Sequence, residues 1–353
     1  MDNRNRPPDQ PNPDDPTQGD VGDAMEAGAP DEHLSPEPTT VRIRPDRDGR
    51  EPAPGEEAPL GSPDRPRTSV DRDRSWLWPV ISLVGLAVVV LMNWLANWLP
   101  LNNQTTGDIS NAHSVPFQPA GWVFSIWLVI YALLAVFVIY SFFPSGRLNA
   151  RIQAIGPLFL ITNIANVSWL FLWHWERFQG AMLALVVLTG VLAAIYILLR
   201  GARRDTGKMS TLQRLVVAVP FSVYLAWACI ATLANVQVWM REGGWDGGLF
   251  GLRGWTVIFL LGGIIVAAGI AFFSHDAAFP LVFVWAYLGI AQRQWGEDML
   301  ISLLAIVLVV AAAALAAMAA ILSFDHRSGP RMTPSEGGGS FWRRGPLRQR
   351  SGT

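Results

Sequence analysis

Long apolar stretches separated by short polar loops occupy the chain from Trp76 to Phe324. Most of them approach or exceed the ~20 apolar residues that a helix needs to cross the hydrocarbon core of a bilayer. The pattern therefore predicts an all-α membrane protein with about eight spans. The seventh stretch is short and contains Pro280, which leaves seven spans as an alternative. The stretches cover residues 76–98, 121–143, 153–174, 180–200, 213–239, 255–273, 279–292 and 299–324.

Composition separates these stretches from the two ends of the chain. Residues 1–73 hold fourteen of the 25 prolines and no Phe, Trp or Tyr, whereas fifteen of the 16 tryptophans lie between 76 and 324. A segment with so little apolar surface cannot offset the entropy of ordering its backbone. We therefore expect residues 1–73 to form a disordered tail, and residues 325–353 to form a second, basic disordered tail.

Arginine and lysine in the short loops predict the orientation of the spans. The loops 144–152 and 200–214 are basic, whereas the loop 99–118 has no Lys or Arg. Basic loops tend to stay in the cytoplasm. With eight spans, both tails are cytoplasmic and the 99–118 loop lies outside.

Motifs of soluble enzymes are missing from the sequence, including the phosphate-binding loop, the zinc-protease helix and the nucleophile elbow. Cys229 is the only cysteine, which excludes a disulfide within the chain and a cysteine-based metal site. Two groups of polar residues at span ends, His174–Arg177 and His275–Asp276, are candidates for a metal site or a proton relay, but interfacial positions explain them as well. We predict no catalytic residues, no metal site and no nucleic-acid partner.

Aromatic residues gather where the second span begins. Phe124, Trp127 and Tyr131 follow a spacing of i, i+3 and i+7, which places them on one helix face. An aromatic belt at the membrane interface explains other rings well, namely Trp76, Trp78, Trp94, Trp98 and Trp122. It explains Tyr131 poorly, because this residue lies about two turns deeper.

Two further spans carry polar residues next to tryptophans. The third has Asn163 and Asn166 close to Trp169 and Trp173, and the fifth has Tyr224, Ala228, Ala231 and Asn235 on one face, with Thr232 and Trp239 at its border. Asparagine in hydrocarbon is costly unless it is hydrogen-bonded. These faces predict either a ligand pocket or helix packing held by asparagines, and the spacing leaves both open.

These residues resemble the motifs of the TspO/MBR family, the tryptophan-rich sensory or translocator proteins. The resemblance covers about 76–240, which corresponds to the five helices of that fold. The second helix of the family opens with an aromatic–x–Pro–Pro–x–Trp–x–Phe signature, the third carries Asn-x-x-Trp and then Arg, and the fifth carries Tyr-x-x-Trp before Ala-Thr-x-x-Asn. The matching residues are Phe117, Pro119, Trp122, Phe124, Trp127 and Tyr131, then Asn166, Trp169 and Arg177, and finally Tyr224, Trp227, Ala231, Thr232 and Asn235.

The sequence also departs from the family. Four residues instead of five separate Trp122 and Trp127, and Ala120 replaces the second proline of the signature. The proline that usually comes just before the tyrosine of the fifth helix is displaced to Pro220. The tail 1–73 and the three spans at 255–324 have no counterpart in compact members. The resemblance is therefore to a longer bacterial branch, which implies a multi-pass protein of the cytoplasmic membrane.

The resemblance implies a binding protein for flat, hydrophobic ligands, such as porphyrins or lipid-like molecules, with a sensory or regulatory role. A transporter, a structural membrane protein and a pigment-degrading enzyme are the alternatives. No cofactor is required, although a porphyrin or haem is expected as a ligand; the bilayer is the other partner, and a homodimer is left open. The expected pocket lies beneath the 99–118 loop and comprises Pro119, Trp122, Phe124, Trp127, Tyr131, Asn166, Trp169, Tyr224, Trp227, Ala231, Thr232 and Asn235.

Overall fold

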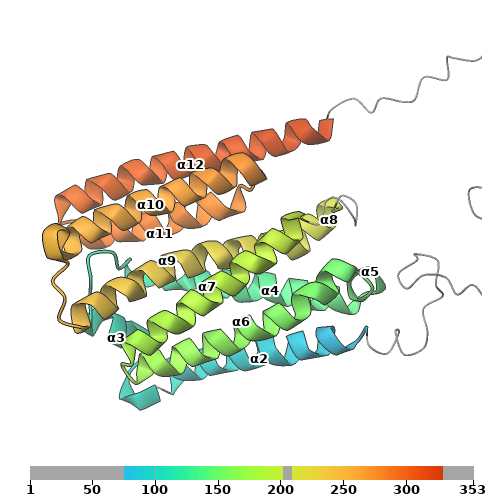
Figure 1. Ribbon diagram of the computed structural model, residues 1–353, viewed down its shortest axis with the longest axis horizontal. Coiled ribbons are helices and arrows are strands. Elements are labelled where there is room, and N and C mark those ends of the chain that lie inside the picture. The colour runs from blue at the N-terminus through green and yellow to red at the C-terminus, as the bar shows by residue number, and fades with distance from the viewer. Residues whose placement is uncertain (1–74, 100, 202–208, 329–353) are drawn as a thin grey trace, which may run out of the picture. The chain divides into compact units, whose positions relative to one another are not determined.

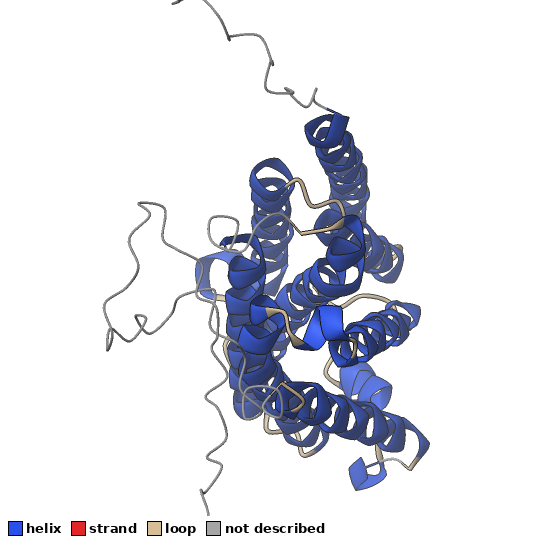
Figure 2. Cartoon of the chain, turned by 90° about the vertical axis from the view of Figure 1, so that its right-hand side faces the viewer, coloured by secondary structure: helices blue, strands red, loops and turns tan. Residues whose placement is uncertain are grey.

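The computed structural model describes residues 75–99, 101–201 and 209–328, and every regular element in these ranges is a helix (Figure 2). The disorder predicted for 1–73 concerns residues outside these ranges, as does most of the predicted tail 325–353. The last helix continues to Ser328, so the predicted boundary at 324 was too early.

Long helices account for all the predicted spans (Figure 1). Among the described residues, seven segments are long and apolar enough to cross a membrane: 77–98, 121–142, 150–174, 178–200, 211–242, 248–274 and 299–323. The eight long helices of the described ranges are α2 (Leu77–Trp98), α4 (Ile126–Phe142), α6 (Ala150–His174), α7 (Phe178–Gly201), α9 (Val219–Glu242), α10 (Gly251–Ser274), α11 (Ala278–Gln294) and α12 (Met299–Ser328).

Helix α11 is the short seventh stretch of the sequence. Its 17 residues span about 25 Å, somewhat less than the ~30 Å of the hydrocarbon core. Pro280 lies in its first turn, where a backbone N–H needs no partner within the helix. Asp276, just before α11, pairs with Arg200 at the end of α7, whereas Arg293 near its other end bonds Asn111. The helix therefore runs from one end of the bundle to the other, although it is not one of the seven described segments that are long and apolar enough to cross a membrane.

Shorter helices join these crossings. Thr105 caps α3 (Thr106–Ala112) by accepting a hydrogen bond from Asp108 N and donating to its carboxylate. The hydrogen bonds from the Thr105 side chain and backbone hold the pKa of Asp108 below its ordinary value. The short elements are η1 (Leu101–Asn103), α3 (Thr106–Ala112), η2 (Gly121–Ser125), α5 (Pro144–Arg147), α8 (Thr211–Gln213), η3 (Arg214–Ala218, a π-helical turn) and η4 (Gly248–Phe250).

Helix packing shows how the C-terminal helices join the others. In the first five crossings α6 packs against α2 and α7, and α9 packs against α7 and α4. Helices α10, α11 and α12 pack against one another, and α11 also lies along α9 (Figure 1). Helix α9, itself one of the first five crossings, therefore makes the main contact between the five-helix part and the three added helices.

Candidate functional site

A cavity of about 50 Å³ lies where α4, α6 and α9 meet the loop that contains α3. Five of the fifteen lining residues are aromatic, namely Phe124 on η2, Trp127 on α4, Trp169 and Trp173 on α6, and Trp227 on α9. Side chains of the 99–118 loop close it on one side. The lining residues are Thr106, Ser110, Val115, Gln118, Pro119, Phe124, Trp127, Trp169, Trp173, Trp227, Ile230, Ala231, Ala234, Asn235 and Val238.

Trp127 of α4 is the centre of the aromatic wall. Its ring stacks on Trp169 of α6, with centroids 6.2 Å apart, and meets Trp227 of α9 edge-on at 6.2 Å. Phe124 lies edge-on to Trp227 at the same distance. On the next turn of α6, Trp173 stacks on Trp169. The three helices thus present flat aromatic surfaces to one small volume, and stacked and edge-on pairs of this kind stabilise each other.

Two polar atoms at this wall have no hydrogen-bond partner among the described residues: the Nε1 donor of Trp227 and the Oε1 acceptor of Gln118. Both residues are almost fully buried. The other end of the Gln118 amide donates to Ser110 Oγ at 2.7 Å, and Trp169 Nε1 donates to Asn235 Oδ1 at 3.2 Å. Buried polar groups are nearly always paired. Both residues line the cavity, so this donor and this acceptor are polar groups of lining residues that lack a partner among the described residues.

A polar network lies beside the cavity rather than in its lining. The Asn166 side chain is fully buried; it accepts from Asn93 Nδ2 at 3.0 Å and donates to Tyr224 Oη at 3.1 Å. Tyr131 stacks on Trp127 at 5.6 Å, and its hydroxyl has no partner in the described part of the chain. Asn166, Tyr224 and Tyr131 thus support the wall from behind.

Two residues of the expected pocket point elsewhere. Trp122 donates to Gln292 Oε1 on α11 and lies edge-on to Trp285, with centroids 4.7 Å apart. Thr232 faces α7, where its hydroxyl lies 2.8 Å from that of Thr189. Trp122 is displaced because residues 121–125 form a 3₁₀ helix, in which successive side chains turn by about 120° instead of 100°.

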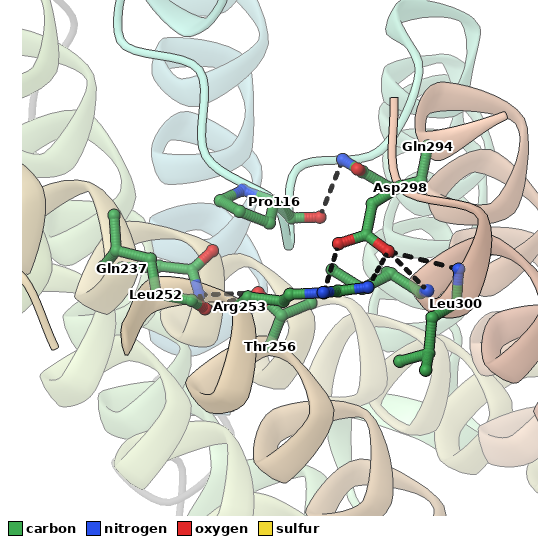
Figure 3. Close-up of polar contacts among 9 residues, drawn as sticks. Pro116, Gln237, Leu252, Arg253, Thr256, Gln294, Asp298 and Leu300 are labelled. Carbon is green, nitrogen blue, oxygen red and sulfur yellow. Dashed lines mark hydrogen bonds and ion pairs between the residues drawn. The ribbon is translucent and has the colours of Figure 1, made fainter. Parts of the chain in front are cut away.

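The loop over the cavity is tied to the helix ends on every side. His113 Nδ1 lies 2.9 Å from Glu242 Oε1, and Phe117 N donates to Gln237 Oε1 at 2.8 Å. Gln294 of α11 donates to Pro116 O at 3.0 Å, a contact drawn in Figure 3. The added C-terminal helices therefore help to hold the roof of the cavity in place.

The polar residues at the span ends, His174–Arg177 and His275–Asp276, lie in different surroundings. No group of three or more His, Cys, Asp and Glu side chains there is placed to hold a metal ion. His174 is fully buried, with Nδ1 2.8 Å from Leu170 O within its own helix. Asp276 accepts hydrogen bonds from Tyr196, Arg200 and Ser222.

Several lining residues were missed at the sequence level. Gln118, Thr106 and Ser110 lie in a loop and a short helix, where no extended periodicity predicts direction. Trp173 is also absent from the expected pocket. It lies one helical turn beyond Trp169, and that spacing is a signal for the same face.

Comparison with protein families supports the resemblance found in the motifs. A family profile described as TSPO-like protein matches residues 79–321. The match extends over α10, α11 and α12, beyond residue 240 where the motif resemblance ended. Neither the comparison with curated proteins nor that with solved structures finds a match.

Proposed function

The chain belongs to the TSPO-like protein family, and on this premise we propose that it binds flat, largely apolar ligands within the membrane. The observation that carries the proposal is the tryptophan-lined cavity in which Trp227 Nε1 and Gln118 Oε1 have no partner. Ligand pockets in proteins are typically apolar and aromatic, with a few polar groups that fix orientation. For the bound ligand we propose a sensory or regulatory role.

A tetrapyrrole such as protoporphyrin IX or haem fits this chemistry. Its flat faces match the stacked rings of Trp127 and Trp169, and a carboxylate or carbonyl at its edge accepts a hydrogen bond from Trp227 Nε1. Gln118 Oε1 accepts a hydrogen bond from a donor on the ligand. Both polar groups of the wall are then satisfied, which removes the cost of burying them unpaired.

The cavity must widen to admit such a ligand. Its 50 Å³ is well below the ~300–1,000 Å³ of small-molecule sites. In this proposal the 99–118 loop, which forms the roof of the cavity, opens most readily. Hydrogen bonds and an ion pair hold the roof, whereas the wall on α4, α6 and α9 consists of packed aromatic rings. Opening requires the Phe117–Gln237 and His113–Glu242 contacts to separate.

Orientation and location are part of the same proposal. The loops 144–152 and 200–214, opposite the cavity, carry seven basic residues, whereas the helix ends on the cavity side carry four, namely Arg177, Arg241, Arg253 and Arg293; this excess favours the cytoplasmic side for the first group. Both ends of the chain lie on that side and the cavity lies near the outer face of a bacterial inner membrane.

Titration with protoporphyrin IX tests the proposal, with tryptophan fluorescence quenching and pigment absorbance as the readouts. Trp227→Phe keeps an aromatic ring and removes the N–H donor. A lost hydrogen bond to a charged group costs about 1.5–3 kcal/mol, or roughly 10- to 150-fold in affinity. Trp94→Phe is the matched control, because Trp94 is 51% exposed on α2, away from the cavity.

We expect Trp227→Phe and Gln118→Leu to weaken binding while Trp94→Phe leaves it unchanged. Equal effects of all three substitutions, or no saturable binding by the unmodified protein, would refute the proposal. Recovery of unaltered pigment after incubation in light and in darkness distinguishes binding from degradation. Uptake into proteoliposomes tests the transport alternative.

A further inference from the structure

A buried glutamine of α9 joins the roof of the aromatic cavity to helix α10. Gln237 is fully buried, and its Oε1 accepts a hydrogen bond from Phe117 N at 2.8 Å. Its Nε2 donates to Leu252 O at 2.9 Å and to Thr256 Oγ1 at 2.8 Å, both on α10 (Figure 3). A backbone N–H only donates and a carbonyl oxygen only accepts, so these partners fix the orientation of the amide.

Gln237 affects the cavity through Phe117 and the residues that follow it. Phe117 lies directly before Gln118 and Pro119, which both line the cavity. The Phe117 ring also meets Phe259 of α10 edge-on, with centroids 5.8 Å apart. The backbone and the side chain of Phe117 are thus held against α9 and α10. Gln237 itself does not line the cavity, so its role is to position the roof.

The ion pair of the roof is more exposed than this bridge. The side chains of His113 and Glu242 are 19% and 33% exposed. Exposed ion pairs contribute little to stability, because water replaces the partner when the two side chains separate. Gln237, Phe117 and Thr256 have no exposed surface, so their groups exchange partners with water only after the roof has moved.

A second buried contact holds the same segment but is simpler. Gln294 of α11 donates a single hydrogen bond to Pro116 O at 3.0 Å (Figure 3). Separation of Phe117 from Gln237 instead leaves both a buried N–H and a buried amide oxygen without a partner. A buried polar group that loses its partner costs more than a typical hydrogen bond contributes. Of these two buried contacts, the Gln237 bridge therefore resists opening more strongly.

From this difference we propose that Gln237 is the positioning residue that sets how fast the roof opens, and that α10 controls the opening through Thr256. The bonds to Leu252 and Thr256 hold the Gln237 amide in the orientation that accepts from Phe117 N. Their loss therefore weakens the roof contact without any change in the roof itself. The proposal rests on the proposed binding function in one respect, which is that the ligand enters through the roof.

The test measures the roof of the full-length protein in neutral detergent, with and without pigment. Stopped-flow quenching of tryptophan fluorescence by protoporphyrin IX gives the association rate. Hydrogen exchange followed by mass spectrometry reports how often the backbone amides of 105–120 open in the absence of a ligand. Gln237→Leu removes all three bonds, and both the association rate and the exchange rate should rise about tenfold.

Thr256→Val is the milder variant, because it removes only a hydroxyl and keeps the shape of the side chain. Both rates should rise about threefold, whereas Thr256→Ser keeps the hydroxyl and should match the unmodified protein. Thr162→Val is the matched control. Thr162 is also fully buried, but its hydroxyl donates to Phe159 O at 2.7 Å within α6, and it does not line the cavity. Its rates should stay unchanged, and melting temperatures show whether each variant is folded.

Hydrogen exchange separates this proposal from the binding function. Faster exchange in Gln237→Leu and Thr256→Val, but not in Thr162→Val, supports the role of Gln237 even when the unmodified protein binds no pigment. Unchanged exchange in the first two variants would overturn it. Equal acceleration in Thr256→Val and Thr162→Val would also overturn it, because it would indicate general loosening of the bundle. Pigment that associates at an unchanged rate despite faster exchange would overturn the control of ligand entry.

Discussion

Gly289, near the C-terminal end of α11, lies where that helix meets the segment that enters the aromatic cavity. Its carbonyl accepts a hydrogen bond from Ala120 N at 3.0 Å. A Cβ atom at this position would lie 2.1 Å from Val123 Cγ2 and 3.2 Å from Pro119 Cβ. Val123 is β-branched and fully buried, and Pro119 is a rigid ring, so neither can move aside cheaply. Gly289→Ala should therefore push the segment away from α11.

The expected loss of stability follows from three terms. Overpacking costs about 1–3 kcal/mol, and a strained hydrogen bond from Ala120 adds up to about 1 kcal/mol. Alanine in place of glycine within a helix returns about 0.5–1 kcal/mol. The free energy of unfolding should thus fall by at most about 3.5 kcal/mol, with a middle value of about 2 kcal/mol. Because Pro119 lines the aromatic cavity, affinity for protoporphyrin IX should fall as well.

Gly262→Ala provides the control for this prediction. Gly262 lies in the interior of α10, and a Cβ atom there would meet nothing within 4 Å. The substitution should leave stability unchanged or raise it slightly, without an effect on pigment binding. Equilibrium unfolding by SDS titration, together with pigment titration, measures both quantities. If the two variants unfold alike, α11 does not pack against residues 119–123 as described.

Further predictions concern the polar network, the tail and the topology. Asn166→Leu leaves Asn93 and Tyr224 without their shared partner, so the free energy of unfolding should fall by about 1–3 kcal/mol, as SDS titration would show. A chain that starts at Asp71 should bind protoporphyrin IX as tightly as the full-length protein, and weaker binding after normal insertion would contradict the prediction. A reporter active only in the periplasm should work when fused after Ser110 and fail after Ser328; activity at both sites would indicate seven crossings.

The sequence predicts the helices well because their length has a single physical cause. A bilayer of fixed thickness requires apolar runs of fixed length, so the limits of α2 and α6 fall within three residues of the predicted ones. The convergence of Trp127, Trp169 and Trp227 was also predictable, because all three lie on long helices with regular spacing. A regular α-helix carries directional information along its whole length.

The direction in which a side chain points is harder to predict where the helix type changes or where a loop begins. Trp122 lies in the 3₁₀ turn before α4 and contacts Gln292 and Trp285 on α11 instead of lining the cavity. Gln118 lies in a loop, where direction depends on tertiary contacts such as its bond to Ser110. Thr232 was placed at the border of its face, and only the position of α7 decides that its hydroxyl meets Thr189.

The largest gap between sequence and structure concerns the three added helices. The family motifs end near residue 240, so the motifs alone give α10, α11 and α12 no connection to the cavity. The contacts in the structure do connect these helices to it. Gln237 of α9 accepts from Phe117 N in the roof, while its amide donates to Leu252 O at 2.9 Å and to Thr256 Oγ1 at 2.8 Å on α10 (Figure 3).

One buried amide thus joins the roof of the cavity to α10, and Ala120 N joins the next part of the same segment to α11. Hydrophobic periodicity does not predict such hydrogen bonds. A glutamine near the end of a span is as consistent with a position at the membrane interface as with a buried position that joins two segments. Any movement of the roof that admits a ligand must strain these bonds. The added helices therefore influence how readily the cavity opens, although none of their residues lines it.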